Sequence, residues 1–342
     1  MKIRFQYFAV VALSLLILAS CRSSYIRYVD VETVHPAKIT FPVYIRNIAF
    51  VNNALGSSKC TISEGGGPEF SLMDADSLAM DMLAIVADSI SHSPYFDLVT
   101  IGSIADTSSM ILKRMSPGLL DEVRDATGAQ TVISMDGFQM VIDKTYFSRT
   151  NELVLEFVGK TFFKIYEPGN DDTPQTHICV DTMVWNSGGW GFYLDDMHFL
   201  MDKVSDAIAY FASQNINRFI PYLRLSERYV YVTGNTSMLD AERYVIQDKW
   251  EEASYLWEHL YETGEGETLR AKAASNMAVV CEMRDDFSAA IDWAKKSYDL
   301  FNQPAVREKN IEELRSMDNY IKLLQQRQKE IPLLQEQMDR RR

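Results

Sequence analysis

The sequence predicts an α+β fold in which helices cover one face of a mixed β-sheet, followed by an all-α module of helical hairpins. Between residues 41 and 233, segments rich in β-branched and aromatic residues alternate with segments whose apolar residues recur every three or four positions. Between residues 238 and 302, one pattern of aromatic residues and alanine occurs twice. A chain of 342 residues is long enough to bury one large core and a smaller second one.

Residues 1–20 are predicted to be a secretory signal. Lys2 and Arg4 precede an apolar run over residues 8–19, which is too short to cross about 30 Å of hydrocarbon as a helix. The segment then ends Leu18-Ala19-Ser20-Cys21, which resembles the bacterial lipobox. That resemblance implies cleavage before Cys21 and lipidation of this cysteine, so that acyl chains would anchor the mature protein durably in a membrane. An ordinary secretory signal followed by an incidental cysteine is the alternative.

The residues after Cys21 bear on which membrane is used. Arg22 stands where an aspartate commonly signals retention in the inner membrane, and residues 22–25 lack the acidic residues of surface-exposed lipoproteins. We therefore expect an outer-membrane lipoprotein that faces the periplasm. Residues 21–40 show little pattern and are predicted to be a tether.

The α+β domain is predicted over residues 41–233. Asp74, which closes a capping-box-like Ser71-x-x-Asp74, begins an amphipathic helix that Pro94 prevents from continuing. A second helix has Pro117 in its first turn and Gly128 just past its end. The strands are expected at residues 43–51, 95–99, 131–140, 153–165, 178–184 and 229–233, and the helices at residues 75–90, 117–127 and 198–223.

Two of these strands are expected to form an antiparallel hairpin. Residues 153–165 alternate, with apolar residues gathered on one face of the strand. In the second strand, Ile178, Val180 and Val184 form the matching apolar row across a link rich in turn residues, residues 168–172. We therefore expect these three side chains to meet the apolar face of the first strand.

The order of these pieces is similar to a recurrent envelope domain. The segments Ile48-Ala49-Phe50-Val51, Tyr95-Phe96-Asp97-Leu98-Val99 and Gly128-Ala129-Gln130-Thr131-Val132 carry the resemblance. It is to the curli secretion lipoprotein and to the amino-terminal domain of the Tol propeller protein. This chain departs from the pattern at Gln130, where Asp is usual, and at Met135-Asp136-Gly137, where a single Gly is usual. The resemblance implies an assembly or interaction module rather than an enzyme.

The second module, residues 238–302, resembles tetratricopeptide repeats. Each copy of the pattern has an aromatic residue, then Ala three positions later, then an apolar residue four further on. Alanine lets helix axes approach closely, while the aromatic side chains fill the space between paired helices. Two repeats seldom hold together alone, so they are expected to dock on the first domain or on the tail. The residues expected to pack the repeats or contact a partner are Trp250, Ala253, Trp257, Ala278, Phe287 and Ala290.

A wider resemblance covers nearly the whole chain. The segment from Arg228-Tyr229 through Gly234-Asn235 and into the repeats looks like that of uncharacterised Bacteroidetes-type outer-membrane lipoproteins. It implies a compartment and an architecture but no activity. Residues 303–342 are predicted to be a polar helical tail, ended or kinked at Pro332, whose last three arginines are solvated.

Composition and motifs argue against several functions. A net charge of −13 repels nucleic acid phosphates, so nucleic acid is not an expected partner. The sequence contains no P-loop, HExxH, Gly-x-Ser-x-Gly or dinucleotide-binding motif, and its five histidines lack the spacing of metal ligands. Gly65-Gly66-Gly67 is interpreted as a flexible loop, and Asp195-Asp196-x-His198 as a helix cap rather than a metal site. We therefore expect no metal, no cofactor and no enzymatic activity.

The three cysteines after Cys21 cannot all pair within one chain. Cys179 and Cys281 lie in apolar segments and are expected to be buried. Cys60 lies in a segment rich in Gly and Ser and is expected to be a free thiol, with a Cys60–Cys179 disulfide as the alternative.

Taken together, the sequence favours a non-enzymatic envelope lipoprotein that binds or assembles with another envelope protein, whose identity the sequence does not give. The alternative is a protein that binds cell-wall glycan or a small ligand, or an enzyme acting on it, through residues Trp185 to Tyr193.

Overall fold

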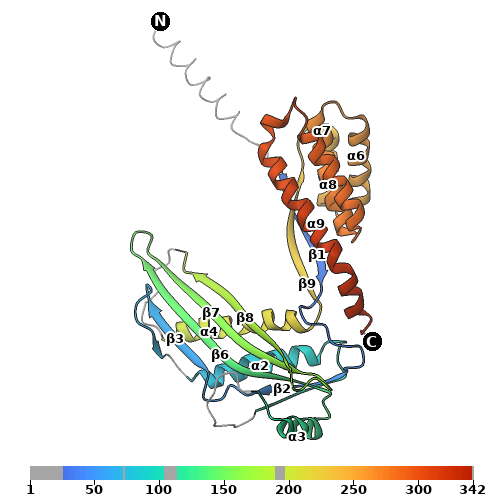
Figure 1. Cartoon of the computed structure of the whole chain (residues 1–342). Helices are drawn as coiled ribbons and strands as arrows, with labels where there is room; N and C mark the ends of the chain where they lie inside the picture. Colours follow the sequence, from blue (N-terminus) through green and yellow to red (C-terminus); the bar gives the residue numbers. More distant parts are fainter. Residues whose placement is uncertain (1–25, 72–73, 104–113, 189–196, 341–342) are drawn as a thin grey trace, which may run out of the picture. The chain divides into compact units, whose positions relative to one another are not determined.

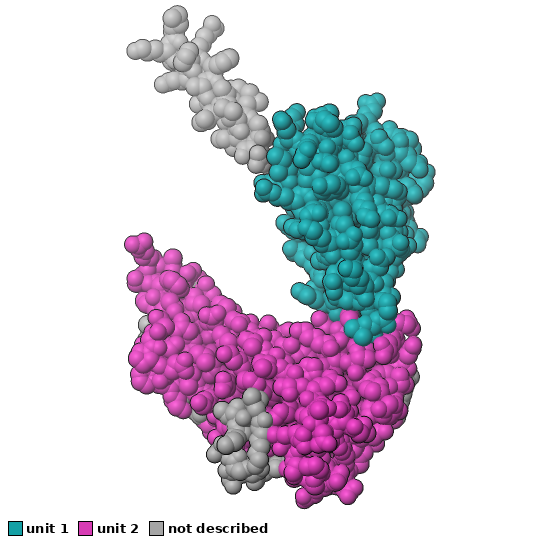
Figure 2. All heavy atoms as spheres, viewed as in Figure 1, with its two compact units in different colours: residues 1–35, 223–333 teal, residues 36–222, 334–342 magenta. Residues whose placement is uncertain are grey.

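A computed structural model describes residues 26–71, 74–103, 114–188 and 197–340. The chain forms two compact units (Figure 2). Unit 1 comprises residues 1–35 and 223–333, and unit 2 comprises residues 36–222 and 334–342. The predicted α+β class is confirmed, with a mixed sheet in unit 2 and a helical carboxyl-terminal region (Figure 1).

Unit 2 is built on a seven-stranded mixed sheet. The long strand β6 (Thr131–Phe147) pairs along one edge with β7 (Glu152–Tyr166), which pairs in turn with β8 (Gln175–Asn186), and both pairings are antiparallel. The other edge of β6 is shared by two parallel strands, β2 (Asn47–Asn52) and β3 (Lys59–Glu64). The sheet is completed by β5 (Leu98–Ser103), parallel to β2, and by β4 (Phe70–Ser71), antiparallel to β3.

Two helices cover one face of this sheet. Both α2 (Ala75–Ser91) and α4 (Met197–Phe219) bury an apolar stripe against alternate residues of the strands, among them Phe50, Ile133 and Phe157. The intervening residues of β2 and β6 point the other way. There Val51 and Val132 pack with Leu120 of a third helix, α3 (Pro117–Thr127). Helices therefore cover one face as predicted, and α3 adds a partial layer on the opposite face (Figure 1).

The helices begin and end where local sequence signals place them. The α3 helix has the predicted bounds: the Ser116 hydroxyl accepts a hydrogen bond from the Leu119 amide, and Gly128 ends the helix at a φ of 69°. The α2 helix is capped by Asp74, whose side chain accepts from the Asp76 amide.

A glycine on β7 sets how closely α4 approaches the sheet. A Cβ built on Gly159 would lie 2.7 Å from the ring of Phe211, which is itself buried on α4. No side chain fits between this ring and the strand, so the backbone of β7 forms part of the wall against which α4 packs.

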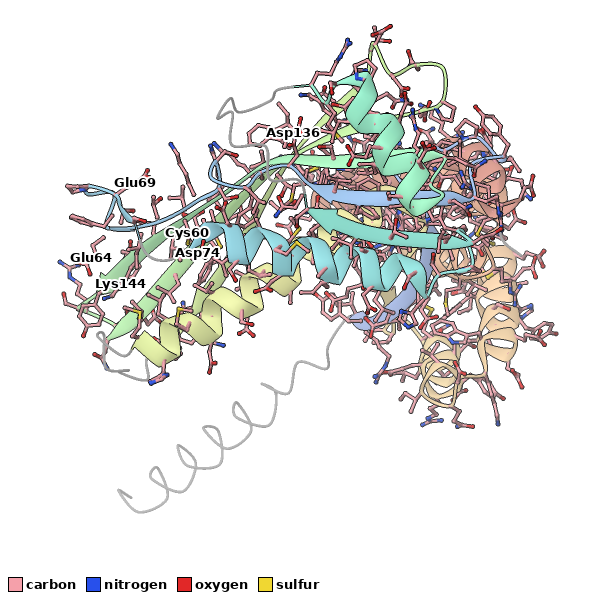
Figure 3. All side chains as sticks on the ribbon, turned by 90° about the horizontal axis from the view of Figure 1, so that it is seen from below. Cys60, Glu64, Glu69, Asp74, Asp136 and Lys144 are labelled. Atoms are coloured by element: carbon pink, nitrogen blue, oxygen red, sulfur yellow. The ribbon has the colours of Figure 1, made fainter. Side chains whose placement is uncertain are left out.

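An extra residue in β6 carries a buried ion pair. The β6–β7 register shifts between Met135 and Gly137, as it does at a β-bulge. The intervening Asp136 is buried, and its carboxylate lies 2.7 Å from the Lys164 Nζ while accepting hydrogen bonds from Ser134 and from Asn53. Figure 3 shows Asp136 well separated from Lys144, which lies further along β6 and pairs with Glu64 at the end of β3.

Unit 1 contains helices and a two-stranded sheet. The sheet pairs β1 (Ile26–His35) with β9 (Tyr222–Tyr231). The Asn276 amide, buried on a helix, donates to the Tyr231 carbonyl oxygen and accepts from its backbone N–H, so it occupies a backbone position beside β9. The helices are α5 (Thr236–Ile246), α6 (Trp250–Thr263), α7 (Glu267–Met283), α8 (Phe287–Phe301) and α9 (Ile311–Met338), with a short 3₁₀ helix at Arg307–Lys309.

Four local predictions are wrong. Residues 26–35, predicted as tether, form β1, because β9 supplies a pairing partner almost 200 residues away in sequence. The strand predicted at 229–233 pairs with β1 rather than with the large sheet. The segment around Cys60, predicted as a loop, is β3, and Cys60 is buried in the core.

The fourth concerns Arg340, which was expected to be solvated. Its guanidinium is buried and donates hydrogen bonds to the carbonyl oxygens of Phe41, Pro42 and Ile45. Burial, with the charge of Arg46 nearby, lowers the pKa of Arg340 to about 10. Arg340 is therefore an integral part of unit 2.

Within the described parts of the chain, no helix has both the length and the apolar composition needed to cross a membrane.

We predict that Gly159→Ala lowers the free energy of unfolding of unit 2 by about 1–3 kcal/mol, because the new methyl group overlaps the Phe211 ring. Gly118→Ala on α3 is the matched control, since a Cβ there meets open space, and it should change stability by less than about 0.5 kcal/mol. Urea unfolding of both variants measures the difference. Equal effects would contradict the close packing of α4 on β7.

Candidate binding surface

The β8 strand forms an edge of the sheet. Among the strands that the structure describes, β8 pairs only with β7. Its twelve residues alternate between the face that α2 and α4 cover and the opposite face. Cys179, Met183 and Trp185 belong to or pack against the core.

The apolar row that was expected to meet the apolar face of β7 points away from the core. Ile178, Val180 and Val184 are 61%, 53% and 60% exposed. The alternation was identified correctly, but the residues that face inwards are those at odd-numbered positions. On the open face of β7, half-buried Val158 and Phe162 lie beside Thr182 and Ile178. They alternate with exposed Glu156 and Lys160, which lie beside Val184 and Val180.

The backbone of the same residues points to the free edge. The Ser187 amide donates to the Leu153 carbonyl oxygen, which makes 153 and 187 a hydrogen-bonded pair. In an antiparallel ladder such pairs recur at every second residue, so the odd-numbered residues of β8 bond to β7. The N–H and C=O groups of Ile178, Val180, Thr182 and Val184 are therefore directed away from β7.

Charged groups on the inner face of β8 are compensated from α4. Arg218 contacts both carboxylate oxygens of Asp181, at 3.0 and 2.9 Å, and both side chains are mostly buried. Burial, reinforced by the Arg218 charge, lowers the pKa of His177. Burial raises the pKa of the Cys179 thiol, which makes this cysteine unreactive at neutral pH.

Trp185 is half-buried and is partly covered by two residues of α4. Its ring packs edge-on against Phe199, with centroids 5.0 Å apart, and the Lys203 Nζ lies 5.9 Å from the ring centre. The remainder of the Trp185 to Tyr193 region, from residue 189 onwards, lies outside the described residues.

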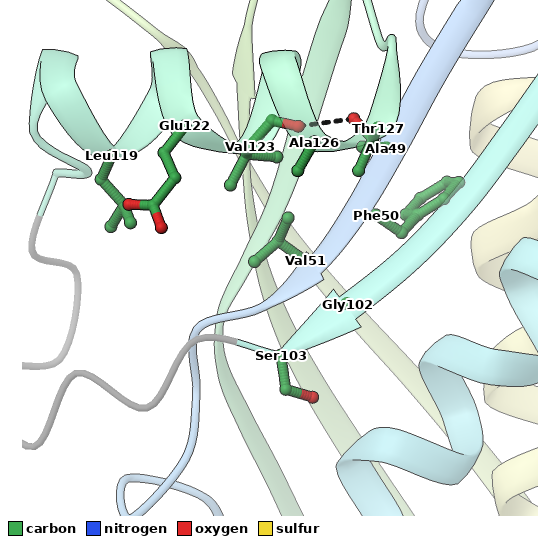
Figure 4. A pocket seen from close by; sticks show the side chains of 10 residues that line it. All are labelled: Ala49, Phe50, Val51, Gly102, Ser103, Leu119, Glu122, Val123, Ala126 and Thr127. Carbon is green, nitrogen blue, oxygen red and sulfur yellow. Dashed lines mark hydrogen bonds between the residues drawn. The ribbon is translucent and has the colours of Figure 1, made fainter.

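An apolar cavity of about 310 Å³ lies between α3 and the β2 and β5 strands (Figure 4). Val51, Leu119 and Val123 form much of its wall, and among the described residues of its lining Glu122 is the one that is ionisable. The Thr127 hydroxyl is occupied by a hydrogen bond to the Val123 carbonyl oxygen. The cavity thus offers apolar contact but no cluster of polar groups that could orient a substrate.

A second cavity, of about 210 Å³, lies in unit 1 between β9, α7 and α9. Beside it, Arg228 forms a two-point ion pair with Glu282, with distances of 2.8 and 2.7 Å, and the Tyr320 hydroxyl donates to Glu282 at 2.6 Å. Glu282 is fully buried. Burial, together with the Glu282 charge, raises the pKa of Tyr320 well above its ordinary value. The cluster satisfies its own charges, which is typical of a structural network.

The residues expected to pack the repeats or contact a partner lie in unit 1. All except Trp250 are at most 4% exposed, so they pack between helices and offer little surface to a partner. Trp250 is partly buried against the same core, and its indole N–H donates to Asp248. These buried residues are Ala253, Trp257, Ala278, Phe287 and Ala290.

The two described cysteines of unit 2 lie on strands that are far apart in the sheet. Cys60, Cys179 and Cys281 are free and buried. Cys60 on β3 and Cys179 on β8 are three strand spacings apart, about 14 Å, whereas a disulfide requires Cα atoms within about 7 Å. The alternative Cys60–Cys179 disulfide is therefore wrong. Cys21 and the Asp195-Asp196 pair lie outside the described residues.

No group of three or more His, Cys, Asp or Glu side chains suited to a metal ion occurs in the regions that the structure describes.

The protein is thus an α+β protein in which unit 2 has an open edge strand and unit 1 is mainly helical. Residues 45–231 match the family described as Domain of unknown function (DUF8603), which spans more than half of the chain, so the protein belongs to that family. Residues 239–326 match a second family, Domain of unknown function (DUF6340). No curated protein matches the chain significantly.

Solved structures give only distant matches. The PelC dodecamer from Paraburkholderia phytofirmans is 12% identical, over 56% of this chain and 96% of that chain, with a TM-score of 0.23. A neuraminyllactose-binding hemagglutinin homolog from Helicobacter pylori is 11% identical, over 53% and 89%, with a TM-score of 0.27. The hypothetical protein CT253 from Chlamydia trachomatis is 7% identical, over 50% and 100%, with a TM-score of 0.19. Similarity at this level supports no inference about function.

We predict that Glu282→Gln lowers the free energy of unfolding by about 3–5 kcal/mol, because it leaves the Arg228 charge buried without its partner. Glu258→Gln, at an exposed position on α6, should change it by less than about 0.5 kcal/mol. Urea unfolding measures both. A loss below about 1 kcal/mol for Glu282→Gln would show that the cluster is not a structural network.

Proposed function

We propose that the protein is an envelope lipoprotein, anchored in the outer membrane through lipidated Cys21, that binds another envelope protein and catalyses no reaction. The observation that supports this most strongly is the exposed apolar row Ile178, Val180 and Val184 on an edge strand. Contiguous exposed apolar surface is typical of sites that bind other macromolecules. An edge strand in addition presents unpaired backbone groups to a partner.

The two cavities support a catalytic role less well than the β8 edge supports a binding role. The α3 cavity has a single carboxylate, and the polar groups beside the unit 1 cavity are bound to one another. Acid–base or nucleophilic catalysis requires at least two functional groups that converge on a substrate. The described residues supply no such convergence at either cavity.

The alternative, recognition of cell-wall glycan through residues 185–193, also has less support. Glycan-binding aromatic rings present an open face to the sugar, whereas Trp185 is half-buried and lies against Phe199 and Lys203.

We predict that Cys21→Ser abolishes incorporation of a labelled fatty acid and releases the protein from the outer-membrane fraction. The serine hydroxyl is not a substrate for thioether formation, so no acyl chain is added. Metabolic labelling and membrane fractionation measure the two effects, with Cys60→Ser as the matched control that should retain both. Continued membrane association of the Cys21→Ser protein without the label would contradict lipid anchoring.

We predict that a photo-crosslinking amino acid at Val180 captures one discrete envelope protein in living cells, because Val180 lies at the centre of the exposed row. The same amino acid at Tyr255, which is 71% exposed on unit 1, is the control for chance encounters. Mass spectrometry identifies what each position captures. Capture of the same abundant outer-membrane proteins from both positions would contradict a binding role for this surface.

A further inference from the structure

We infer that β8 accepts an extended segment of its partner as an additional strand, and that this segment alternates apolar β-branched residues with basic residues. The inference rests on the proposed function, because it specifies how the proposed partner is recognised. Three features of β8 determine the chemistry of the segment: its backbone, its outward side chains and its charge.

The backbone requires an extended partner. The N–H and C=O groups of Ile178, Val180, Thr182 and Val184 are directed to the free edge, as the Ser187–Leu153 hydrogen bond and the unbroken register with β7 establish. Successive residues of this set are about 6.8 Å apart along the strand. A helix or an irregular loop does not present donors and acceptors at that interval, whereas a β-strand does.

The side chains require alternation. Every second residue of an added strand would stand beside Ile178, Val180, Thr182 or Val184 on the open face, with Cβ atoms about 5 Å apart. Apolar β-branched residues at these positions cover the row that is now more than half exposed. Polar residues there would bury that row against groups that need water.

The charge favours basic residues at the other positions. The residues between the apolar ones would stand on the α4 side of the sheet, where Arg218 already neutralises Asp181, so the preference rests on the charge of the whole chain. The chain as a whole carries a net charge of −13, which attracts a basic segment at a distance.

A second copy of this chain is the competing occupant, and it fits less well. It carries the same net charge of −13. We therefore assign the edge to a different, basic chain.

The experiment measures binding of a labelled nonapeptide, alternating valine and lysine, to the purified protein by fluorescence anisotropy. Two control peptides have valine alternating with glutamate, or the same valines and lysines in blocks. We expect both controls to bind at least about tenfold more weakly than the alternating peptide. Equal binding of the glutamate peptide would overturn the charge assignment, and equal binding of the block peptide would overturn the alternation.

The backbone contacts are tested from both sides. Thr182→Pro removes an N–H that does not bond to β7, whereas Thr182→Ala keeps it. We expect binding to fall at least about tenfold in the proline variant and less than about twofold in the alanine variant. An alternating peptide that is N-methylated at every second amide provides the same test with the unaltered protein, so that misfolding of the variant cannot mimic the result.

Two outcomes separate this inference from the proposed function. If the Val180 crosslink to one envelope protein persists unchanged in Thr182→Pro cells, strand addition is overturned while partner binding stands. Dimerisation detected by analytical ultracentrifugation and lost in Thr182→Pro would show that a second copy occupies the edge, and would overturn the assignment to a basic chain.

Discussion

The contact between Phe211 and Gly159 is the constraint on which the architecture of unit 2 depends. Because no side chain intervenes, α4 lies directly on the middle of β7 and closes the core over β6, β7 and β8. Arg218, two turns further along α4, then reaches the inner face of β8 and neutralises Asp181. A larger residue at position 159 would lift the helix from the strand, and both the apolar seal and the ion pair would weaken together.

The second face of the sheet is covered much less completely than the face on which α2 and α4 pack. The α3 helix covers only β2 and the first part of β6, where Val51, Val132 and Tyr166 gather around Leu120. Beyond the bulge, Asp136 and Lys164 place an ion pair where a second apolar layer would otherwise begin. The outer face of β7 and β8 therefore belongs to the part of the sheet that no described helix covers, and its apolar residues are available to a partner.

The sequence predicted those elements whose bounds are determined by residues close together in the chain, and missed those that depend on distant residues. The α3 bounds were predicted because Pro117, Ser116 and Gly128 act within a few residues. Strand β1 was missed because its partner β9 is distant in the chain. On β8 the alternation was recognised and Cys179 was expected to be buried, as it is, but Ile178, Val180 and Val184 were matched to the wrong face of β7. Both faces of β8 are largely apolar, and Asp181 interrupts the inner one. Arg218, which pairs with Asp181, lies on α4, and a pattern that extends over ten residues does not include it. The candidate surface was missed for the same reason.

The composition of β8 favours the proposal that a partner binds its edge. Soluble proteins usually protect an edge strand with lysine, proline, a bulge or an inward charge. The outward positions of β8, all of which are described, carry Thr176, Ile178, Val180, Thr182, Val184 and Asn186, with no charge and no proline, and the β7–β8 register is unbroken. Of these protections β8 has only the inward charge of Asp181, which Arg218 neutralises. Twelve residues of such an edge would promote aggregation of a freely diffusing protein at high concentration. Attachment to a membrane through the proposed lipid anchor would limit encounters between edges, and a committed partner would remove the exposed edge, so the proposed anchor and the exposed edge strand are compatible with one function.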